Sequence, residues 1–242
     1  MTVIAFAHRG SPGPGQRENT LPAFRRALAA GASALESDAW LTADDVPVLV
    51  HDRLLWMGHH RRAIRDLRAD ELPEWLPSLP DLYRELGADY DLSLDLKDPD
   101  GAEAVLAAAG AVGATRRLWL CAEIPLLRRC RQLSTEVRLV NSTRLRGRLT
   151  TPVVQRLANE GIDALNLREP EWTPARVDLA HAADRLAFAW DVQTTPVLDR
   201  VRRDGCDAIY SDSVELLRAV PSAGRRELTD LQQRRCAAEN QW

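Results

Sequence analysis

Short apolar stretches alternate with helix-like stretches along most of this chain, and that alternation constrains its fold more than any other feature. Apolar, β-branched and aromatic residues predict eight strands, at residues 3–7, 34–40, 92–96, 117–121, 137–140, 164–167, 186–190 and 208–210. Segments rich in Ala, Leu and Arg predict helices at residues 21–30, 102–109, 126–133, 152–160, 176–183 and 197–204. Such alternation is typical of βα units and a parallel sheet.

The length of the chain, 242 residues, suits one α/β barrel as well as two small domains. Eight strands favour one closed barrel, because closure buries both faces of a parallel sheet and leaves no exposed edge. We therefore predict an α/β protein with a single (β/α)8 TIM barrel over residues 1–220 and an extra short strand at residues 46–50. Residues 221–242 are polar and rich in Arg and Gln, which predicts a C-terminal tail that is either a short helix or disordered.

The overall charge limits the partners that this chain attracts. A net charge of −3 at pH 7 gives no general attraction to nucleic acid or to anionic lipid headgroups. We expect a small-molecule partner, no nucleic acid and no stable membrane insertion, while the oligomeric state is not predicted. The N-terminus lacks the pattern of a signal peptide and no later segment is apolar enough to span a membrane, so we expect a cytoplasmic location. The cysteines form no C-x-x-C pair, which indicates reduced structural thiols at Cys121, Cys130, Cys206 and Cys236.

A histidine and an arginine stand at the end of the first predicted strand. The C-terminal ends of the strands open onto the active-site face of a TIM barrel, so His8 and Arg9 are candidates for a functional role. Taken alone, such a pair is more often structural, but here an irregular loop rich in Gly and Pro follows it. Thr20 is predicted to cap the helix after this loop, with Pro22 in its first turn.

Two carboxylates lie on one face of the second predicted strand. Glu36 and Asp38 are two residues apart, so their side chains project to the same side. A solvated polar face is the alternative, but the flanking apolar residues predict that this strand is buried. Buried carboxylates repel each other unless a cation lies between them, and Mg²⁺ and Ca²⁺ prefer oxygen ligands. The pattern therefore predicts a divalent-cation site and leaves the identity of the ion open.

A second histidine and the only lysine extend this set of candidates. The strand expected at residues 46–50 leads into His51. On the third strand, Asp95 and Lys97 are again two residues apart and face one way. An isolated Asp-x-Lys is more often an ordinary ion pair, but Lys97 is the only lysine among the 32 Lys and Arg residues.

Several short motifs follow one another in a specific order. Before residue 55 they are His8-Arg9-Gly10, Glu18-Asn19-Thr20, Glu36-x-Asp38, Thr42-x-Asp44, Pro47-Val48 and His51-Asp52. The later and looser ones are Leu79 before a helix, Asp95-Leu96-Lys97, Trp190 and residues 205–212. This series resembles the glycerophosphodiester phosphodiesterases, a family of phospholipase C-like phosphodiesterase TIM barrels, over about residues 3 to 220.

The resemblance implies an enzyme that hydrolyses glycerophosphodiesters to an alcohol and glycerol 3-phosphate with one divalent cation, Mg²⁺ or Ca²⁺. The implied ligands of that cation are Glu36, Asp38 and Asp95. The implied acid and base are His8 and His51, in an order that the sequence does not assign. The implied substrate contacts are Arg9, Lys97 and Trp190.

The chain departs from the family pattern at two places. Asp95 stands where the family usually has Glu and reaches about 1.5 Å less far, so it binds the cation through water or its strand shifts inward. Residues 190–193 are Trp-Asp-Val-Gln, where Trp-Thr-Val-Asn is common. Asp191 either points away from an anionic substrate or engages a cationic alcohol such as choline, with Trp190 offering a cation–π face.

The cap that often follows the second motif histidine is expected to be reduced or absent, because residues 52–94 must also contain a helix. His59 and His60 lie in this segment and are expected to be exposed or near the substrate, not metal ligands. A reduced cap leaves open a lysophospholipase D-type activity on lipid substrates. The departures at Asp95, Asp191 and Gln193 leave open a catalytically silent phosphate-binding barrel.

Overall fold

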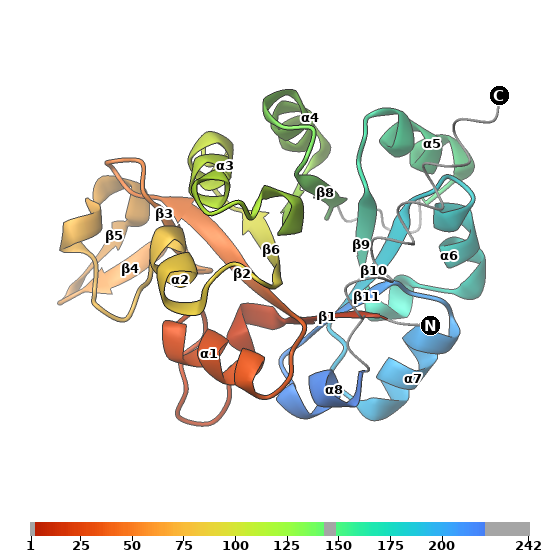
Figure 1. Ribbon diagram of the computed structural model, residues 1–242, viewed down its shortest axis with the longest axis horizontal. Coiled ribbons are helices and arrows are strands. Elements are labelled where there is room, and N and C mark those ends of the chain that lie inside the picture. Colours follow the sequence, from red (N-terminus) through yellow and green to blue (C-terminus); the bar gives the residue numbers. More distant parts are fainter. Residues whose placement is uncertain (1–2, 143–148, 221–242) are drawn as a thin grey trace.

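Eight parallel strands form a closed barrel in the computed structural model, which describes residues 3–142 and 149–220 (Figure 1). The strand order is β1-β11-β10-β9-β8-β7-β6-β2, and pairing of β1 with β2 closes the ring. These strands are β1 (Ile4–Ala7), β2 (Ala34–Leu41), β6 (Asp91–Leu96), β7 (Leu118–Ala122), β8 (Arg138–Asn141), β9 (Ala164–Arg168), β10 (Leu186–Trp190) and β11 (Ala208–Ser211). The prediction of a (β/α)8 TIM barrel is confirmed, with each strand within one residue of its expected bounds.

Helices cover the outside of the barrel (Figure 1). In the described part of the chain they are α1 (Leu21–Ala29), α2 (Leu79–Leu86), α3 (Ala102–Ala111), α4 (Ile124–Leu133), α5 (Thr151–Asn159), α6 (Pro174–His181), α7 (Thr195–Arg203) and α8 (Val214–Ala219). Thr20 caps α1 as predicted, because its hydroxyl oxygen accepts a hydrogen bond from the Ala23 N–H at 3.4 Å. The sequence does not predict α8, because six residues are too few to show a helical period.

Aromatic side chains fill the inside of the barrel. The rings of Phe6 and Tyr210 stack with centroids 4.8 Å apart, and those of Trp119 and Phe188 lie 5.1 Å apart. All four are buried, so the barrel interior is a packed core and not a channel. A second, larger apolar cluster lies between the strands and the helices. Because side chains alternate along a strand, His8 lies two positions beyond Phe6 and one layer nearer the C-terminal end of the barrel.

A small cap follows the second barrel strand. Its elements are β3 (Pro47–Leu49), β4 (Leu54–Met57) and β5 (His60–Ala63). β3 pairs antiparallel with β2 and is the extra strand expected at residues 46–50, while β4 and β5 form a separate hairpin. Leu55 and Ile64 pack under the hairpin in a small apolar cluster of their own. The expected reduced cap is therefore this hairpin, and His59 and His60 are exposed on it.

The described cysteines are buried and form no disulfide; they are Cys121, Cys130 and Cys206. Cys236 and the tail predicted for residues 221–242 lie outside the described residues. In the part of the chain that the structure describes, every helix is too short or too polar to cross a membrane.

Gly10 leads out of the first barrel strand with φ of +76°, a left-handed conformation that favours glycine. A Cβ atom there would lie 2.9 Å from the Ala23 Cβ, so α1 would have to move. Gly15 has φ of +74°, but no atom lies within 4 Å of a Cβ at that position. We expect Gly10→Ala to lower the free energy of unfolding by about 3 kcal/mol and Tm by about 9 °C. The matched control Gly15→Ala should lower them by about 1 kcal/mol and about 3 °C. Thermal unfolding followed by circular dichroism measures both, and equal shifts would contradict close packing of Gly10 against α1.

Candidate active site

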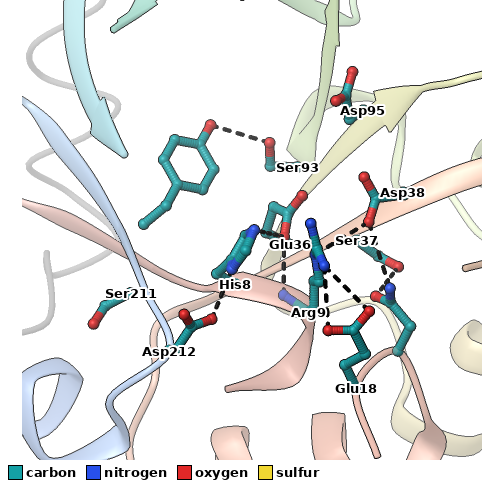
Figure 2. Close-up of polar contacts among 12 residues, drawn as sticks. His8, Arg9, Glu18, Glu36, Ser37, Asp38, Ser93, Asp95, Ser211 and Asp212 are labelled. Carbon is teal, nitrogen blue, oxygen red and sulfur yellow. Dashed lines mark hydrogen bonds and ion pairs between the residues drawn. The ribbon is translucent and has the colours of Figure 1, made fainter. Parts of the chain in front are cut away.

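The predicted ligand carboxylates come from neighbouring strands. Glu36 and Asp38 lie on β2, and in the β2–β6 register Asp38 is opposite Asp95. Glu36 is 6% exposed and Asp38 is 3% exposed, so the two side chains do not form a solvated face. Figure 2 shows Glu36 and Asp38 along β2 and Asp95 near the end of β6, with His8 and Arg9 approaching from the end of β1.

Arg9 contacts both carboxylates of β2 because the chain turns sharply after β1. Arg9 and Ser11 have φ of 50° and 52°, in the left-handed region. The turn directs the backbone N–H of Arg9 to Glu36 Oε2 at 2.9 Å. The guanidinium donates to both carboxylate oxygens of Glu18 at 3.2 Å, and its Nε lies 3.5 Å from Asp38 Oδ2 (Figure 2). The loop therefore places one cation among three carboxylates.

Asn19 ties the same loop to β2. Its side-chain oxygen accepts the Ser37 hydroxyl at 2.7 Å, and its amide nitrogen donates to Asp38 Oδ2 at 3.4 Å. Its backbone N–H donates to the Arg9 carbonyl at 2.9 Å. Within the Glu18-Asn19-Thr20 motif, Glu18 thus holds Arg9 and Asn19 holds Asp38. Neither role is predictable from the sequence, because the partners meet only in the folded loop.

His8 lies between two carboxylates (Figure 2). Its Nδ1 is 2.7 Å from Asp212 Oδ1, and its Nε2 is 3.8 Å from Glu36 Oε2. Burial by itself lowers the pKa of His8, but the charges of Glu36 and Asp212 outweigh burial and raise the pKa to about 9. Burial raises the pKa of Asp212, but the hydrogen bond with His8 outweighs it and the net shift is downward. Sequence reasoning missed Asp212, although this residue ends the motif at residues 205–212.

Lys97 is the cation that compensates two of the predicted ligands. Its Nζ lies 3.1 Å from Asp38 Oδ1 and 2.5 Å from Asp95 Oδ2. Burial lowers the pKa of Lys97, but the two carboxylates outweigh burial and raise it. Burial raises the pKa of Asp95, and it raises that of Glu36 to about 7, with the negative charge of Asp38 adding to the shift. For Asp95 and Glu36, burial therefore disfavours the charged form more than the cationic neighbours favour it.

His51 stands at the outer edge of this cluster. Its Nδ1 lies 3.0 Å from Asp52 Oδ1, and its side chain is 39% exposed. Burial raises the pKa of Asp95, and His51 is among the groups that oppose this shift. The charge of His51 therefore acts on Asp95, whereas Nε2 of His8 lies 3.8 Å from Glu36 Oε2.

Trp190 lies apart from the other predicted residues. It ends β10 and is half-exposed, and the guanidinium of Arg168 lies 5.7 Å from its ring centroid. Arg168 also binds Asp191, through Nη2 at 2.7 Å and Nε at 2.9 Å. The charge of Asp191, which stands where the family commonly has Thr, is therefore neutralised by Arg168. Among the described residues, no hydrogen bond, ion pair or ring contact joins Trp190 to the carboxylate cluster.

The carboxylates are chemically suited to a hard divalent cation, because Mg²⁺ and Ca²⁺ prefer oxygen ligands. Burial, and after it the charge of Asp38, raises the pKa of Glu36, and an added cation would favour the charged form of this carboxylate. Residues 3–142 and 149–220 nevertheless contain no preassembled group of three His, Cys, Asp or Glu side chains that could hold a metal ion. Asp38 and Asp95 are bound to Lys97, so a cation would compete with Lys97 for their oxygens.

Known proteins are similar to this chain over most of its length. The model of the glycerophosphoryl diester phosphodiesterase family matches residues 8–85. The protein named "Probable glycerophosphodiester phosphodiesterase 2" of Mycobacterium tuberculosis is 30% identical over 239 residues, which cover 90% of each chain. The chain therefore belongs to the glycerophosphodiester phosphodiesterase family of enzymes.

Solved structures share the fold. A glycerophosphodiester phosphodiesterase from Thermotoga maritima has a TM-score of 0.79 and 23% identity, covering 91% of this chain and 99% of that one. A phosphodiesterase from Oleispira antarctica, in complex with the product sn-glycerol-3-phosphate, has a TM-score of 0.78 and 19% identity, covering 90% and 96%. Both similarities cover nine-tenths or more of each chain.

Replacing Lys97 should expose the repulsion between Asp38 and Asp95. In the absence of added divalent cations, we expect Lys97→Met to lower the free energy of unfolding by about 2 kcal/mol, less than for a fully buried pair because Lys97 is 25% exposed. Lys97→Arg keeps the charge and is the matched control, with a smaller loss. Adding Asp95→Asn to Lys97→Met should recover most of the stability, because the two changes act on one ion pair. Urea unfolding measures all three variants, and additive losses in the double variant would contradict this compensation.

Proposed function

We propose that this enzyme hydrolyses glycerophosphodiesters to an alcohol and glycerol 3-phosphate, using one divalent cation and a histidine pair. The observation that carries the proposal is the set of buried carboxylates in contact with cationic side chains at the C-terminal end of the barrel. Phosphodiester hydrolysis needs neutralised phosphate charge, an activated oxygen nucleophile and a protonated leaving group. The relative from Oleispira antarctica, in complex with sn-glycerol-3-phosphate, supports this product.

The cation would be held by Glu36, Asp38 and Asp95, and both Mg²⁺ and Ca²⁺ suit these oxygen ligands. A bound divalent cation supplies an electrophile that stabilises negative charge on the phosphoryl oxygens. Asp95 contacts Lys97 at 2.5 Å, so direct ligation by Asp95 requires Lys97 to give up this contact. The shorter Asp side chain makes ligation through water the alternative.

The histidine pair would move the protons of the reaction. Nδ1 of His8 is bound to Asp212, so Nε2 is the ring atom left to exchange a proton with the substrate. His51 follows the same pattern, because its Nδ1 lies against Asp52. One histidine must begin neutral and the other protonated for the pair to act as base and acid.

Three side chains would bind the substrate. The guanidinium of Arg9 lies beside Asp38 and would offer its N–H donors to a phosphate oxygen. Lys97 adds a point charge beside the carboxylates. Trp190 would contact the alcohol or glycerol part from the end of β10.

A lysophospholipase D-type activity on lipid substrates is the second candidate, and the small cap favours it. The cap is one hairpin that begins shortly after His51, and Leu54 and Trp56 on it are 37% and 68% exposed. Such apolar side chains could contact an acyl chain. A silent phosphate-binding barrel is less well supported, because Asp191 and Gln193 both have partners in the structure.

Purified protein should release glycerol 3-phosphate from glycerophosphocholine and glycerophosphoethanolamine when Mg²⁺ or Ca²⁺ is present. A chelator should lower the rate by about 10²-fold or more, because the electrophile is removed, and excess cation should restore it. Coupled oxidation of glycerol 3-phosphate measures the rate. Turnover that is insensitive to the chelator would refute the metal requirement. Cleavage of lysophosphatidylcholine alone would favour the second candidate, and no turnover with any cation would favour the silent barrel.

Removing either proposed proton-transfer group should slow turnover. We expect His8→Ala and His51→Ala each to lower kcat by about 10² to 10⁴-fold, the usual contribution of general acid–base catalysis. His59→Ala and His60→Ala are matched controls on the exposed hairpin and should leave kcat unchanged. Steady-state kinetics with glycerophosphocholine measures all four variants, and a comparable loss in a control would argue against the assignment.

A further inference from the structure

A chain of hydrogen bonds leads from His8 through Asp212 to Gln193, a residue that the proposed reaction does not use. His8 Nδ1 lies 2.7 Å from Asp212 Oδ1, and Gln193 Nε2 donates to Asp212 Oδ2 at 2.8 Å. Each oxygen of the carboxylate is thereby bound to a different side chain. The three residues follow β1, β11 and β10, so the chain of contacts links the first barrel strand to the last two in the sequence.

The amide of Gln193 is oriented by the groups around it. Its Oε1 accepts the backbone N–H of Asp212 at 3.1 Å and the hydroxyl of Ser211 at 3.3 Å. A backbone N–H can only donate, so the amide oxygen must face it and the amide nitrogen must face the carboxylate. Ser211 is fully buried and its hydroxyl accepts the Ser213 N–H at 3.1 Å, which fixes the end of β11 as well.

Asp212 needs a second contact to hold one position. Its side chain is 44% exposed, so water competes for both of its oxygens. A carboxylate held through one oxygen alone can rotate away from its partner, whereas one held through both cannot. The contact from Gln193 therefore restricts Asp212 to the orientation that faces His8.

The length of Gln193 explains why this contact forms. The family pattern commonly has Asn at this position, and Asn is one methylene, about 1.5 Å, shorter. From the same backbone position a shorter amide would not reach both the Asp212 N–H and Asp212 Oδ2. Gln193, which departs from the Asn of the family pattern, is thus the residue that holds Asp212.

We propose that Gln193 is a positioning residue, which locks Asp212 against His8 and so keeps His8 Nε2 directed at the substrate. The inference rests on the proposed role of His8 in proton transfer. Gln193 contacts none of the proposed substrate-binding side chains, so its loss should affect kcat and not KM.

Two substitutions remove the contact in different ways. Gln193→Glu replaces the donor with an oxygen that repels Asp212, and Gln193→Met removes both polar ends at similar length. We expect both to lower kcat on glycerophosphocholine by about tenfold with KM unchanged. The loss is smaller than the whole contribution of a general acid or base, because His8 itself remains. The matched control is Gln155→Glu on α5, where Gln155 Nε2 donates to Asn159 Oδ1 at 3.1 Å outside the site; its kcat should not change.

A double-mutant cycle with His8→Ala separates positioning from a general structural effect. If Gln193 acts through His8, adding Gln193→Met to His8→Ala should cause no further loss of kcat. The same tenfold loss in both backgrounds, or a rise in KM alone, would overturn the inference.

Nitrogen-15 spectra of the histidine rings test the positioning without reference to activity. The Nδ1 signal of His8 should shift in both Gln193 variants. His181, whose Nε2 lies 2.8 Å from Asp207 Oδ2 at the other end of the barrel, is the internal control and should not shift. An unchanged His8 signal would overturn the inference, even in an enzyme with full activity. A shifted signal together with normal kcat in His8→Ala would instead support the positioning and refute the proposed role of His8.

Discussion

Buried negative charge on the neighbouring strands β2 and β6 is the constraint on which the rest of the site depends. Glu36 and Asp38 are nearly inaccessible to water, and removal from water penalises each charged carboxylate. Nearby cationic side chains offset that penalty; they are Lys97, Arg9 and His8. The groups that would bind phosphate and transfer a proton are therefore the same ones that make the buried carboxylates tolerable, and stability and chemistry share one set of contacts.

The site also depends on closure of the barrel. His8 and Asp212 are in contact although they are 204 residues apart in the chain, and the Ser11 hydroxyl donates to the Ser211 carbonyl across the same seam at 3.1 Å. Contacts of such long range form only after the entropic cost of ordering the intervening chain has been met. The first and last strands must therefore be paired before His8 is fixed, which couples the position of His8 to completion of the fold.

The strands were predictable because parallel barrel strands are short apolar runs, buried on both faces and separated by helical segments. Alternation along β2 likewise indicated that Glu36 and Asp38 share a face. The hairpin of the cap was not predictable as such, because Trp56 is exposed and the apolar alternation is broken. The contacts of Asp212 and Gln193 were hidden for another reason: each is made to a partner that follows another strand, and a local pattern carries no information about that partner.

Two of the departures from the family pattern, at Asp95 and Gln193, are changes of one methylene in opposite directions. Asp95 is shorter than the usual Glu, and its Oδ2 lies 2.5 Å from Lys97 Nζ. Gln193 is longer than the usual Asn, and its Nε2 donates to Asp212 Oδ2 at 2.8 Å. Each altered side chain has found a partner, so neither leaves a buried polar group without compensation. The first change acts where charge is neutralised and the second acts on the partner of His8. The chain thus differs from the family pattern at these two positions, and the shorter Asp95 and the longer Gln193 each still have a polar partner.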